Sequence, residues 1–513
     1  MMKTLTICLI VIFGSLTSNL AAEASLTNEA AILSKIDTLP ISHEDKADLS
    51  RIYQSVNNTL IWPSRNPLLA EIIERFSHAD FDGLDPEVYK ISQSLITQPI
   101  QTDQDILITL ALLTYAKDLN GGRQLIKPTK LIDVHPLQRD VVAIIVAGLI
   151  NGNTQWLEFL PPPHPQYTRL KGALCHFHAL EQKGPWPQID SEHTLKPGDT
   201  HTDVLILRHQ LAMHDLLAFE ESTYFDEKLS QAVIAYQNLH QLEPDGVVGT
   251  LTRVSLNMSP YQWKRLISLN MERWRHFPEF ENAHHILVNI PGNFLKVIRS
   301  GSVVLTLPVV VGRPQRKTPE FIAPMQQVVL NPSWSVPPGI SRDILRKAKE
   351  NPSYLVSKGI RVIDKTTHAH VDPLSVNWAQ YQISPFRFWQ PPGARNALGS
   401  IKFVIKNPYH IYIHGTPDTH VFVKKRRDLS SGCIRLENPK LLLATLFQGT
   451  NDENPLDVDK LLKTKQQKAI PLSQEWPTVT AYFTVWVDKE GRFHSHPDIY
   501  HYDAIALEKY HEF

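Results

Sequence analysis

The spacing of apolar residues changes about half-way along the chain. In the first half they recur every three or four positions, most clearly at 30–39, 68–76 and 106–119, which is the spacing of amphipathic helices. From about residue 285 onward, short apolar runs alternate with polar residues and are separated by Gly, Pro and Asn turns, a pattern typical of antiparallel strands. The chain is therefore predicted to be a multidomain α+β protein, helical first and mostly β afterwards.

The β pattern has one long interruption. Strands are predicted at 285–290, 294–298, 303–311, 327–330, 401–405, 411–414 and 478–487. Between Asn331 and Asn396 the strand pattern lapses, and 341–350 predicts a short helix. We therefore expect an insertion at about 335–395 in a bent sheet or sandwich.

Proline-rich connectors at 161–165 and 185–187 bracket one helix and separate the helical part from a small unit. In that unit the apolar residues that predict one small core are Leu205, Leu207, Leu211, Val233, Tyr236 and Leu239. A helix at 261–274 is expected to join it to the β part. The predicted order is a helical domain at 25–195, the small module at 196–258, the β domain at 265–450, and a C-terminal extension at 451–513 that packs on the other domains.

The first residues have the pattern of an export signal. Lys3 precedes an apolar run at 5–16, and Ala22-Glu23-Ala24 offers a small-residue cleavage site, so 1–24 is predicted to be a signal peptide. The run is shorter than the ~20 apolar residues of a spanning helix, so no stable membrane span is expected, with an uncleaved anchor as the alternative. The formal net charge is zero, which gives no reason to expect a nucleic-acid partner.

The chain has three cysteines, Cys8, Cys175 and Cys433. Cys8 would leave with the signal peptide, and Cys175 is predicted to be a buried residue of a helix. A disulfide between the other two is conceivable in an exported protein, but a nucleophilic cysteine must stay free, so we expect none.

Candidate chemistry gathers at 412–438. Tyr412 and His414 share one face of a short predicted strand, and Ser431-Gly432-Cys433 forms a tight turn after a polar loop. A thiolate nucleophile activated by a neighbouring imidazole fits this pair, with the amides of Gly432 and Cys433 available to an oxyanion and Arg435 to a substrate carboxylate. The alternative is an inert buried cysteine beside a satisfied core histidine.

These residues carry a family resemblance. His414-Gly415-Thr416 followed by Ser430-Ser431-Gly432-Cys433-Ile434-Arg435-Leu436 resembles the active-site signature of the L,D-transpeptidases, with their YkuD-type catalytic domain. Ser431 stands where many short members have a second histidine, as in the large branch that has a scaffold domain. Runs at 270–275, 288–291, 310–312, 331–337 and 396–399 are also similar to that branch. The stretch 25–195 is similar to its scaffold domain, and 196–258 resembles a three-helix peptidoglycan-binding module.

The resemblance implies an acyl transfer. Cys433 would attack the carbonyl of the third residue of a tetrapeptide stem and release the terminal D-alanine, with His414 as base and the Gly415 carbonyl orienting the imidazole. An amine of a second stem would then resolve the thioester into a 3→3 cross-link. Tyr412, Arg435 and Trp378 are the candidate substrate-binding residues, and Trp334 and Trp389 are further groove-lining candidates. No metal or organic cofactor is implied. The expected partners are peptidoglycan and other wall synthases, and the expected location is the periplasm.

Three alternatives remain open on the sequence. Water in place of the amine would make the protein an L,D-carboxypeptidase with the same residues. A zinc peptidase would use His410, His414, His420 and Cys433, although His410 and His414 on an extended strand would lie ~13 Å apart. The third alternative is a non-catalytic wall-binding protein. The run Lys424–Arg427 is either a solvated loop or a site that attracts anionic peptidoglycan, and the acceptor is not determined.

Overall fold

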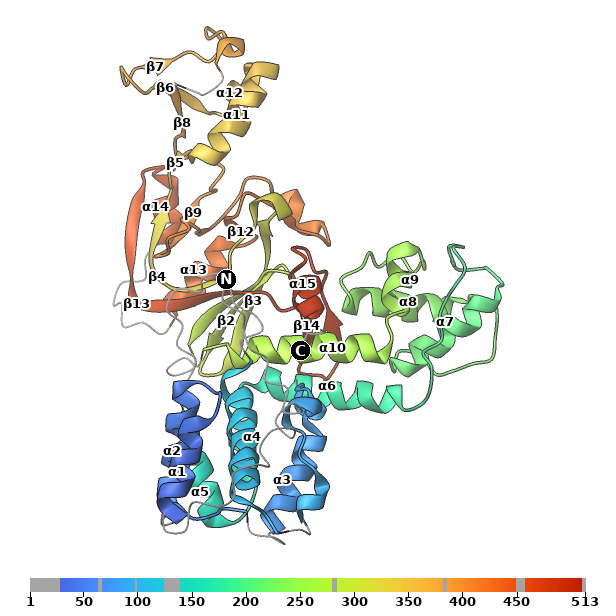
Figure 1. Ribbon diagram of the computed structural model, residues 1–513. Helices are drawn as coiled ribbons and strands as arrows, with labels where there is room; N and C mark the ends of the chain where they lie inside the picture. The colour runs from blue at the N-terminus through green and yellow to red at the C-terminus, as the bar shows by residue number, and fades with distance from the viewer. Residues whose placement is uncertain are drawn as a thin grey trace.

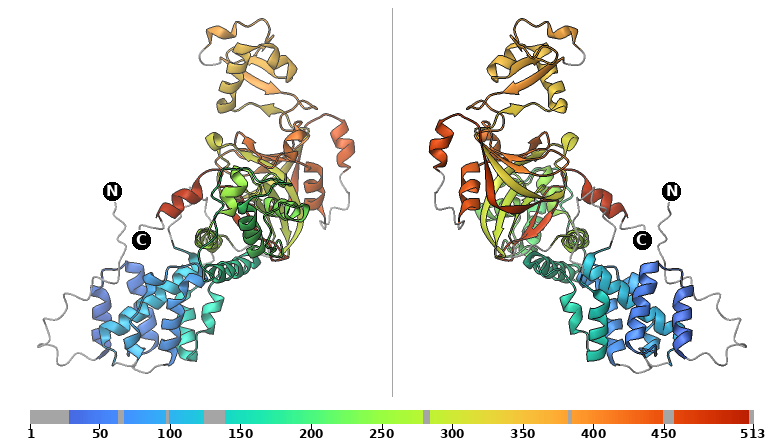
Figure 2. Two further views of the ribbon diagram at one scale, coloured as in Figure 1. Left: turned by 90° about the vertical axis from the view of Figure 1, so that its right-hand side faces the viewer. Right: turned by 90° about the vertical axis from the view of Figure 1, so that its left-hand side faces the viewer.

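The computed structural model describes residues 28–62, 67–96, 99–123, 139–278, 284–381, 385–448 and 457–509. The predicted signal peptide, with Cys8, lies outside these ranges. A helical frame occupies one end of the molecule, a β domain the middle and a cap the other end, with a three-helix module at the side (Figure 1). The two side views show the same order (Figure 2).

The helical frame is built around a single apolar core. Its elements are α1 (Asn28–Thr38), α2 (His43–Ser55), α3 (Pro67–Ser77), η2 (Ala79–Asp82), η3 (Pro86–Tyr89), η4 (Gln93–Ile96), α4 (Thr102–Gly121), α5 (Val141–Asn151) and η5 (Gln155–Phe159). Leucine and isoleucine at helical spacing fill this core, together with Tyr53 and Trp62. The helices predicted at 30–39, 68–76 and 106–119 correspond to α1, α3 and α4.

Two long helices lie side by side between the frame and the β domain, α6 (Pro165–Glu181) and α10 (Pro260–Arg275) (Figure 1). Ser259 caps α10 by accepting a hydrogen bond from the Gln262 amide at 3.3 Å. Trp263 and Trp274 on α10 pack in one cluster with residues of α6 and of the β domain. The three-helix module consists of α7 (Thr202–Met213), α8 (Glu227–Leu239) and α9 (Thr250–Leu256), and it has a core of its own.

The β domain is a nine-stranded sheet. Its strands are β1 (His285–Asn289), β2 (Phe294–Arg299), β3 (Ser302–Gly312), β4 (Phe321–Leu330), β9 (Ile401–Ile405), β10 (Ile413–His414), β11 (Asp428–Ser430), β12 (Ile434–Leu436) and β13 (Lys468–Ala481). The order is β11-β3-β12-β10-β9-β4-β13-β1-β2, and β2 also pairs with β3, so the expected bent sheet or sandwich closes on itself. Helix α13 (Pro439–Phe447) follows β12, and the Asn438 side chain caps it by accepting a hydrogen bond from the Leu441 amide at 3.0 Å.

The predicted C-terminal extension contributes a strand to the interior of this sheet. We expected 451–513 to pack on the other domains. Instead β13 lies between β4 and β1, and its pairing with β4 runs from Lys468↔Leu330 to Thr480↔Phe321. Helix α14 (Val458–Lys463) precedes β13, and a C-terminal segment, 482–509, follows it with β14 (Val485–Val487), β15 (Phe493–Ser495) and α15 (Tyr502–Lys509). Helix α15 lies beside α10 (Figure 1).

The insertion forms the cap, which has its own small sheet and core. Its elements are β5 (Trp334–Ser335), α11 (Pro338–Glu350), α12 (Ser353–Ser357), β6 (Arg361–Asp364), β7 (His370–Val371), η8 (Trp378–Gln380) and β8 (Phe386–Gln390). The helix predicted at 341–350 is present as α11. The four strands were not predicted, because each is two to five residues long and too short to show alternation. Across the described ranges, no helix is both long and apolar enough to cross a bilayer.

Candidate active site

Strand pairing brings the predicted site residues onto one surface. Strands β10 and β12 are parallel neighbours, with Ile413 opposite Ile434 and His414 opposite Arg435. Because side chains two positions apart on a strand share a face, Tyr412, His414, Cys433 and Arg435 lie on the same side of this pair. All four line one cavity of about 340 Å³, whose other wall is the cap.

His414 is a buried, neutral imidazole. Its side chain is 5% exposed, and Nδ1 lies 2.5 Å from the carbonyl oxygen of Gly415. Burial lowers the pKa of His414 to about 3, and the positive charge of Arg435 adds to this effect. With Nδ1 donating to the Gly415 carbonyl, Nε2 carries the lone pair and is available as a base. The orienting contact predicted for Gly415 is therefore present.

Gly415 is in turn positioned by close contact with Gly399. Gly399 has φ +64°, and a Cβ added there would lie 2.7 Å from the carbonyl carbon of Gly415. Asn396 fixes this turn by donating to the carbonyls of Pro332 at 3.0 Å and Pro391 at 2.9 Å. The stretch 396–399 therefore positions Gly415 and, through its carbonyl, the His414 imidazole.

Cys433 is half-buried, and its sulfur lies 3.9 Å from the His410 carbonyl oxygen. Burial raises the pKa of the Cys433 thiol, while hydrogen bonds from Tyr412 and the nearby positive charge of Lys402 oppose that rise. The sequence led us to expect that a neighbouring imidazole lowers this pKa. That expectation is wrong for the resting site, because the net shift is upward and His414 is not among its main causes. The resting pair is thiol and neutral imidazole.

The turn before Cys433 is held on both sides. The Ser430 hydroxyl donates to the Cys433 carbonyl oxygen at 2.6 Å and accepts the Gly432 amide at 3.1 Å. Gly432 has φ +112°, which favours glycine. We predicted that the Gly432 amide faces an oxyanion. The structure corrects this, since the Gly432 amide donates to the Ser430 hydroxyl, whereas the Cys433 amide has no hydrogen-bond partner among the described residues.

Tyr412 supplies a second donor beside the sulfur. Its hydroxyl hydrogen-bonds Cys433, and burial together with that contact raises the pKa of Tyr412, so the phenol stays protonated at neutral pH. The Trp334 side chain hydrogen-bonds Tyr412, and the Lys402 ammonium lies 3.9 Å from the centre of the Tyr412 ring. Tyr412 is thus held in place next to the Cys433 thiol.

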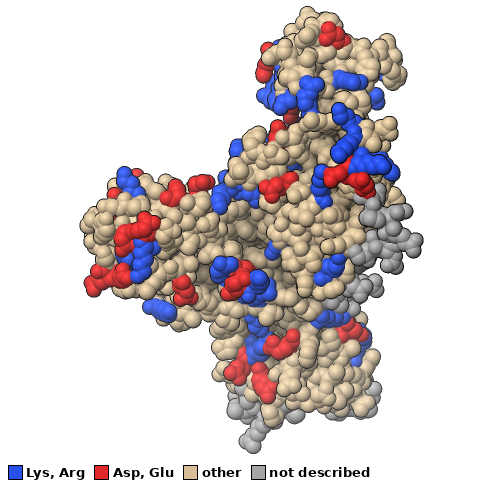
Figure 3. Space-filling view, turned by 180° about the vertical axis from the view of Figure 1, so that it is seen from behind, with Lys and Arg blue, Asp and Glu red and all other residues tan. Residues whose placement is uncertain are grey.

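The cavity is predominantly basic. Arg435 is partly buried in its wall, and burial lowers the pKa of the guanidinium while Asp418 opposes this shift. Four more basic side chains line the cavity, against two acidic ones: Arg313, Lys347, Lys358 and Arg395, with Asp343 and Asp418. Lys and Arg also gather on the cap and around its junction with the β domain in the rear view (Figure 3). The cavity is therefore suited to a ligand that carries carboxylates.

Of the three candidate tryptophans, one lines the cavity. Trp334 does so from β5. The prediction that Trp378 binds substrate is wrong, because its side chain is 2% exposed in the core of the cap, with Nε1 donating to the Pro373 carbonyl at 2.8 Å. Trp389 is not among the lining residues and packs against Arg361 instead.

The structure gives no support to a metal site. Within the described ranges, no three or more His, Cys, Asp or Glu side chains are grouped so that they could hold a metal ion. Cys433 and Cys175 are both free thiols, and Cys175 is exposed on α6 rather than buried as predicted.

Sequence reasoning also missed Thr318, whose hydroxyl donates to the Gly432 carbonyl at 2.7 Å from a loop more than a hundred residues away. No local pattern marks such a contact.

The known proteins that this chain resembles agree with the geometry. A family model described as the L,D-transpeptidase catalytic domain (YkuD) matches residues 283–454. The stretch 283–454 is therefore similar to an L,D-transpeptidase catalytic domain. Models of a scaffold domain and of a putative peptidoglycan binding domain match residues 47–174 and 200–256. The first overlaps most of the helical frame, and the second covers the three-helix module.

One curated relative is a putative L,D-transpeptidase of Haemophilus influenzae, 34% identical over 239 residues. The match covers 46% of this chain and 48% of the relative, so the chain spans about half the length of the relative it matches.

Solved L,D-transpeptidase structures overlap only weakly with the whole molecule. The structure from Stackebrandtia nassauensis has a TM-score of 0.21 at 12% identity, covering 57% of this chain and 96% of that one. The structure from Mycobacterium smegmatis has a TM-score of 0.19 at 12% identity, covering 39% and 58%.

Proposed function

We propose that the protein is an L,D-transpeptidase that forms 3→3 cross-links between peptidoglycan stems through a Cys433 thioester. The observation that carries this proposal is the common face of β10 and β12, where Cys433, His414, Tyr412 and Arg435 line one cavity. A nucleophile, a neutral base, a donor and a carboxylate-binding cation are the groups that acyl transfer from a peptide requires.

In the first step His414 takes the thiol proton as Sγ bonds the carbonyl carbon of the third stem residue. Proton transfer during attack suits the resting state, because the pKa of Cys433 is raised and that of His414 is about 3. The Cys433 amide and the Tyr412 hydroxyl stabilise the oxyanion. The C–N bond then breaks, D-alanine leaves with the proton from His414, and the amine of a second stem resolves the thioester.

The substrate and location follow from the same features. The basic cavity wall, with Arg435 next to the nucleophile, suits tetrapeptide stems that carry free carboxylates. The match of 200–256 to a peptidoglycan-binding family supports the cell wall as the place of action, in the periplasm. Other wall synthases are candidate partners. No metal or cofactor takes part.

The test is to incubate the mature protein with a disaccharide-tetrapeptide and to follow the acyl-enzyme and the products by mass spectrometry. Dimers linked between third residues are expected from the wild type, and none from Cys433→Ala. Cys175→Ala is the matched control, because it removes the other described thiol, which is exposed on α6, and should keep full activity. If tripeptide is the sole product, the activity is that of an L,D-carboxypeptidase and not of a transpeptidase. Full turnover by Cys433→Ala would refute the cysteine mechanism.

A further inference from the structure

The peptide unit between Gly432 and Cys433 is held from the side away from the cavity. The Thr318 hydroxyl donates to the Gly432 carbonyl oxygen at 2.7 Å, and Thr318 is fully buried. A trans peptide unit is planar, so its carbonyl and its N–H point in opposite directions. The hydrogen bond from Thr318 therefore sets the direction of the Cys433 N–H.

Thr318 is fixed by two further residues. Its Oγ1 accepts the Gly312 amide at 2.8 Å, and its own amide donates to the Tyr500 hydroxyl at 3.0 Å. The Tyr500 hydroxyl in turn donates to the Gly312 carbonyl at 2.5 Å. The three residues form a closed set of hydrogen bonds directly behind the nucleophile turn.

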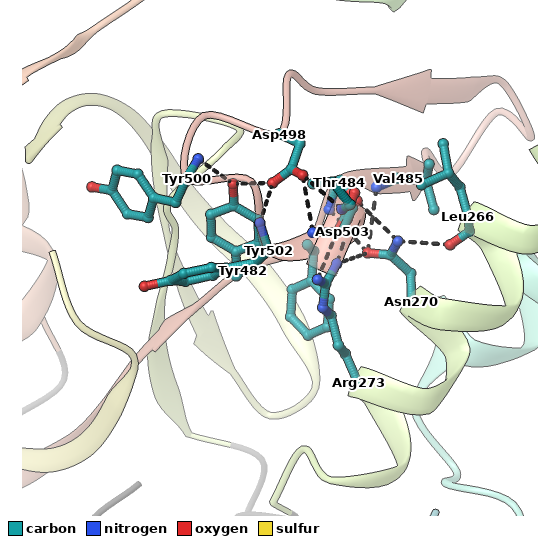
Figure 4. Close-up of polar contacts among 12 residues, drawn as sticks. Leu266, Asn270, Arg273, Tyr482, Thr484, Val485, Asp498, Tyr500, Tyr502 and Asp503 are labelled. Atoms are coloured by element: carbon teal, nitrogen blue, oxygen red, sulfur yellow. Dashed lines mark hydrogen bonds and ion pairs between the residues drawn. The ribbon is translucent and has the colours of Figure 1, made fainter. Parts of the chain in front are cut away.

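Tyr500 belongs to the C-terminal segment, outside the stretch that matches the catalytic family. Its amide donates to the Tyr482 hydroxyl at 2.8 Å, and that hydroxyl donates to Asp498 at 2.6 Å (Figure 4). The other oxygen of Asp498 accepts the Asp503 amide at 3.0 Å, and the Asp503 carboxylate pairs with Arg273 of α10 at 2.6 Å. The contacts behind Cys433 are thus anchored to the helix that connects the domains.

We propose that Thr318 and Tyr500 are positioning residues, which aim the Cys433 amide at the oxyanion of the acyl-transfer intermediate. The inference rests on the proposed function. When Sγ bonds the carbonyl carbon, the π-electron pair moves to the carbonyl oxygen, and the Cys433 N–H donates to it. When the C–N bond breaks, the pair returns and the amine leaves with the proton held by His414. Thr318 acts only through the orientation of the amide.

The test compares Thr318→Val, Thr318→Ser and Tyr500→Phe in a Cys175→Ala background. Thr318→Val keeps the shape and removes the hydroxyl, so kcat for D-alanine release should fall by ~10- to 100-fold, somewhat less than for complete loss of an oxyanion donor. KM should stay nearly unchanged. Thr318→Ser should restore kcat, and Tyr500→Phe should give a smaller loss in kcat.

Alkylation of Cys433 by iodoacetamide distinguishes positioning from general damage, because displacement at an sp³ carbon forms no oxyanion. Its rate should be unchanged in all three variants. Thr478→Val is the matched control, since Thr478 is a fully buried threonine of β13 whose hydroxyl also donates to a backbone carbonyl, that of Trp476. It should keep wild-type kcat.

Two results would overturn the inference alone: wild-type kcat in Thr318→Val, or loss of alkylation in parallel with loss of turnover. If the wild type itself forms no acyl-enzyme and behaves like Cys433→Ala, the proposed function fails and the inference fails with it.

Discussion

Replacing Gly399 by alanine should damage the active site through backbone contact alone. The added Cβ would lie 2.7 Å from the Gly415 carbonyl carbon and 2.8 Å from the Thr416 nitrogen, against an ordinary contact distance of at least 3.4 Å. Both contacts are with backbone, so the His414–Gly415 strand end must move. The cost combines ~1–2 kcal/mol for a left-handed alanine with ~1–3 kcal/mol for overpacking.

The displacement acts on His414, the proposed base. The carbonyl of Gly415 holds Nδ1 of His414 at 2.5 Å, and a shift of that carbonyl by several tenths of an ångström re-aims the imidazole. Because a misplacement of ~1 Å can cost a hundredfold in rate, we expect kcat to fall by ~10- to 100-fold. The assay is release of D-alanine from a tetrapeptide, with thermal unfolding followed in parallel.

Gly152 provides a matched control. It also has φ +64°, but no atom lies within 4 Å of a Cβ added there, and it ends α5 in the helical frame. Gly152→Ala should therefore show only the cost of the left-handed backbone and keep full activity. If Gly399→Ala melts and turns over like Gly152→Ala, the claim that Gly399 supports the histidine is refuted.

Three further predictions concern substrate binding, the cap and pH. Arg435→Gln should raise KM for the tetrapeptide by ~10- to 100-fold, as expected for loss of a charge-assisted hydrogen bond, and an unchanged KM would exclude Arg435 as the carboxylate site. Trp378→Leu should destabilise the cap, since complete truncation of a buried tryptophan costs ~3–5 kcal/mol. Trp334→Phe should leave the melting temperature unchanged and slow acylation. The opposite outcome for the two variants would support Trp378 as a substrate-binding residue. His285 and His496 have pKa values of about 4 and about 3 in the folded protein, below the value of 6.5. Above pH 6.5 these two histidines are neutral in both the folded and the unfolded protein. Below pH 6.5 they bind protons in the unfolded chain but not in the folded one. Stability should therefore fall as pH drops from 6.5 toward 4, by up to ~1.4 kcal/mol per pH unit for each histidine, and denaturation midpoints that are equal at pH 7 and pH 5 would contradict this.

Residue type and spacing predicted the pair of side chains that shares the cavity, Cys433 and His414, better than they predicted individual contacts. Cys433 and His414 were predicted from residue type and spacing, and both line one cavity. The contact of Gly415 with the imidazole was implied by the family resemblance, and the Gly415 carbonyl oxygen lies 2.5 Å from Nδ1 of His414. The oxyanion contact of the Gly432 amide and the substrate contact of Trp378 were predicted wrongly, because each depends on the partner that the group contacts in the folded protein. A tryptophan in an irregular stretch can face a groove or fill a small core, and only the packing of the cap decides between these outcomes.

What the sequence determined by itself is local. The period of apolar residues determined the helical and β halves, and the turn residues determined where most strands end, because both depend on neighbours within a few positions. Tertiary structure alone decided that β13 enters the sheet, that β10 and β12 pair in parallel, and that Thr318 and Tyr500 stand behind Cys433. These depend on strand register and on hydrogen bonds between groups far apart in the chain, for which a sequence carries no periodic signal.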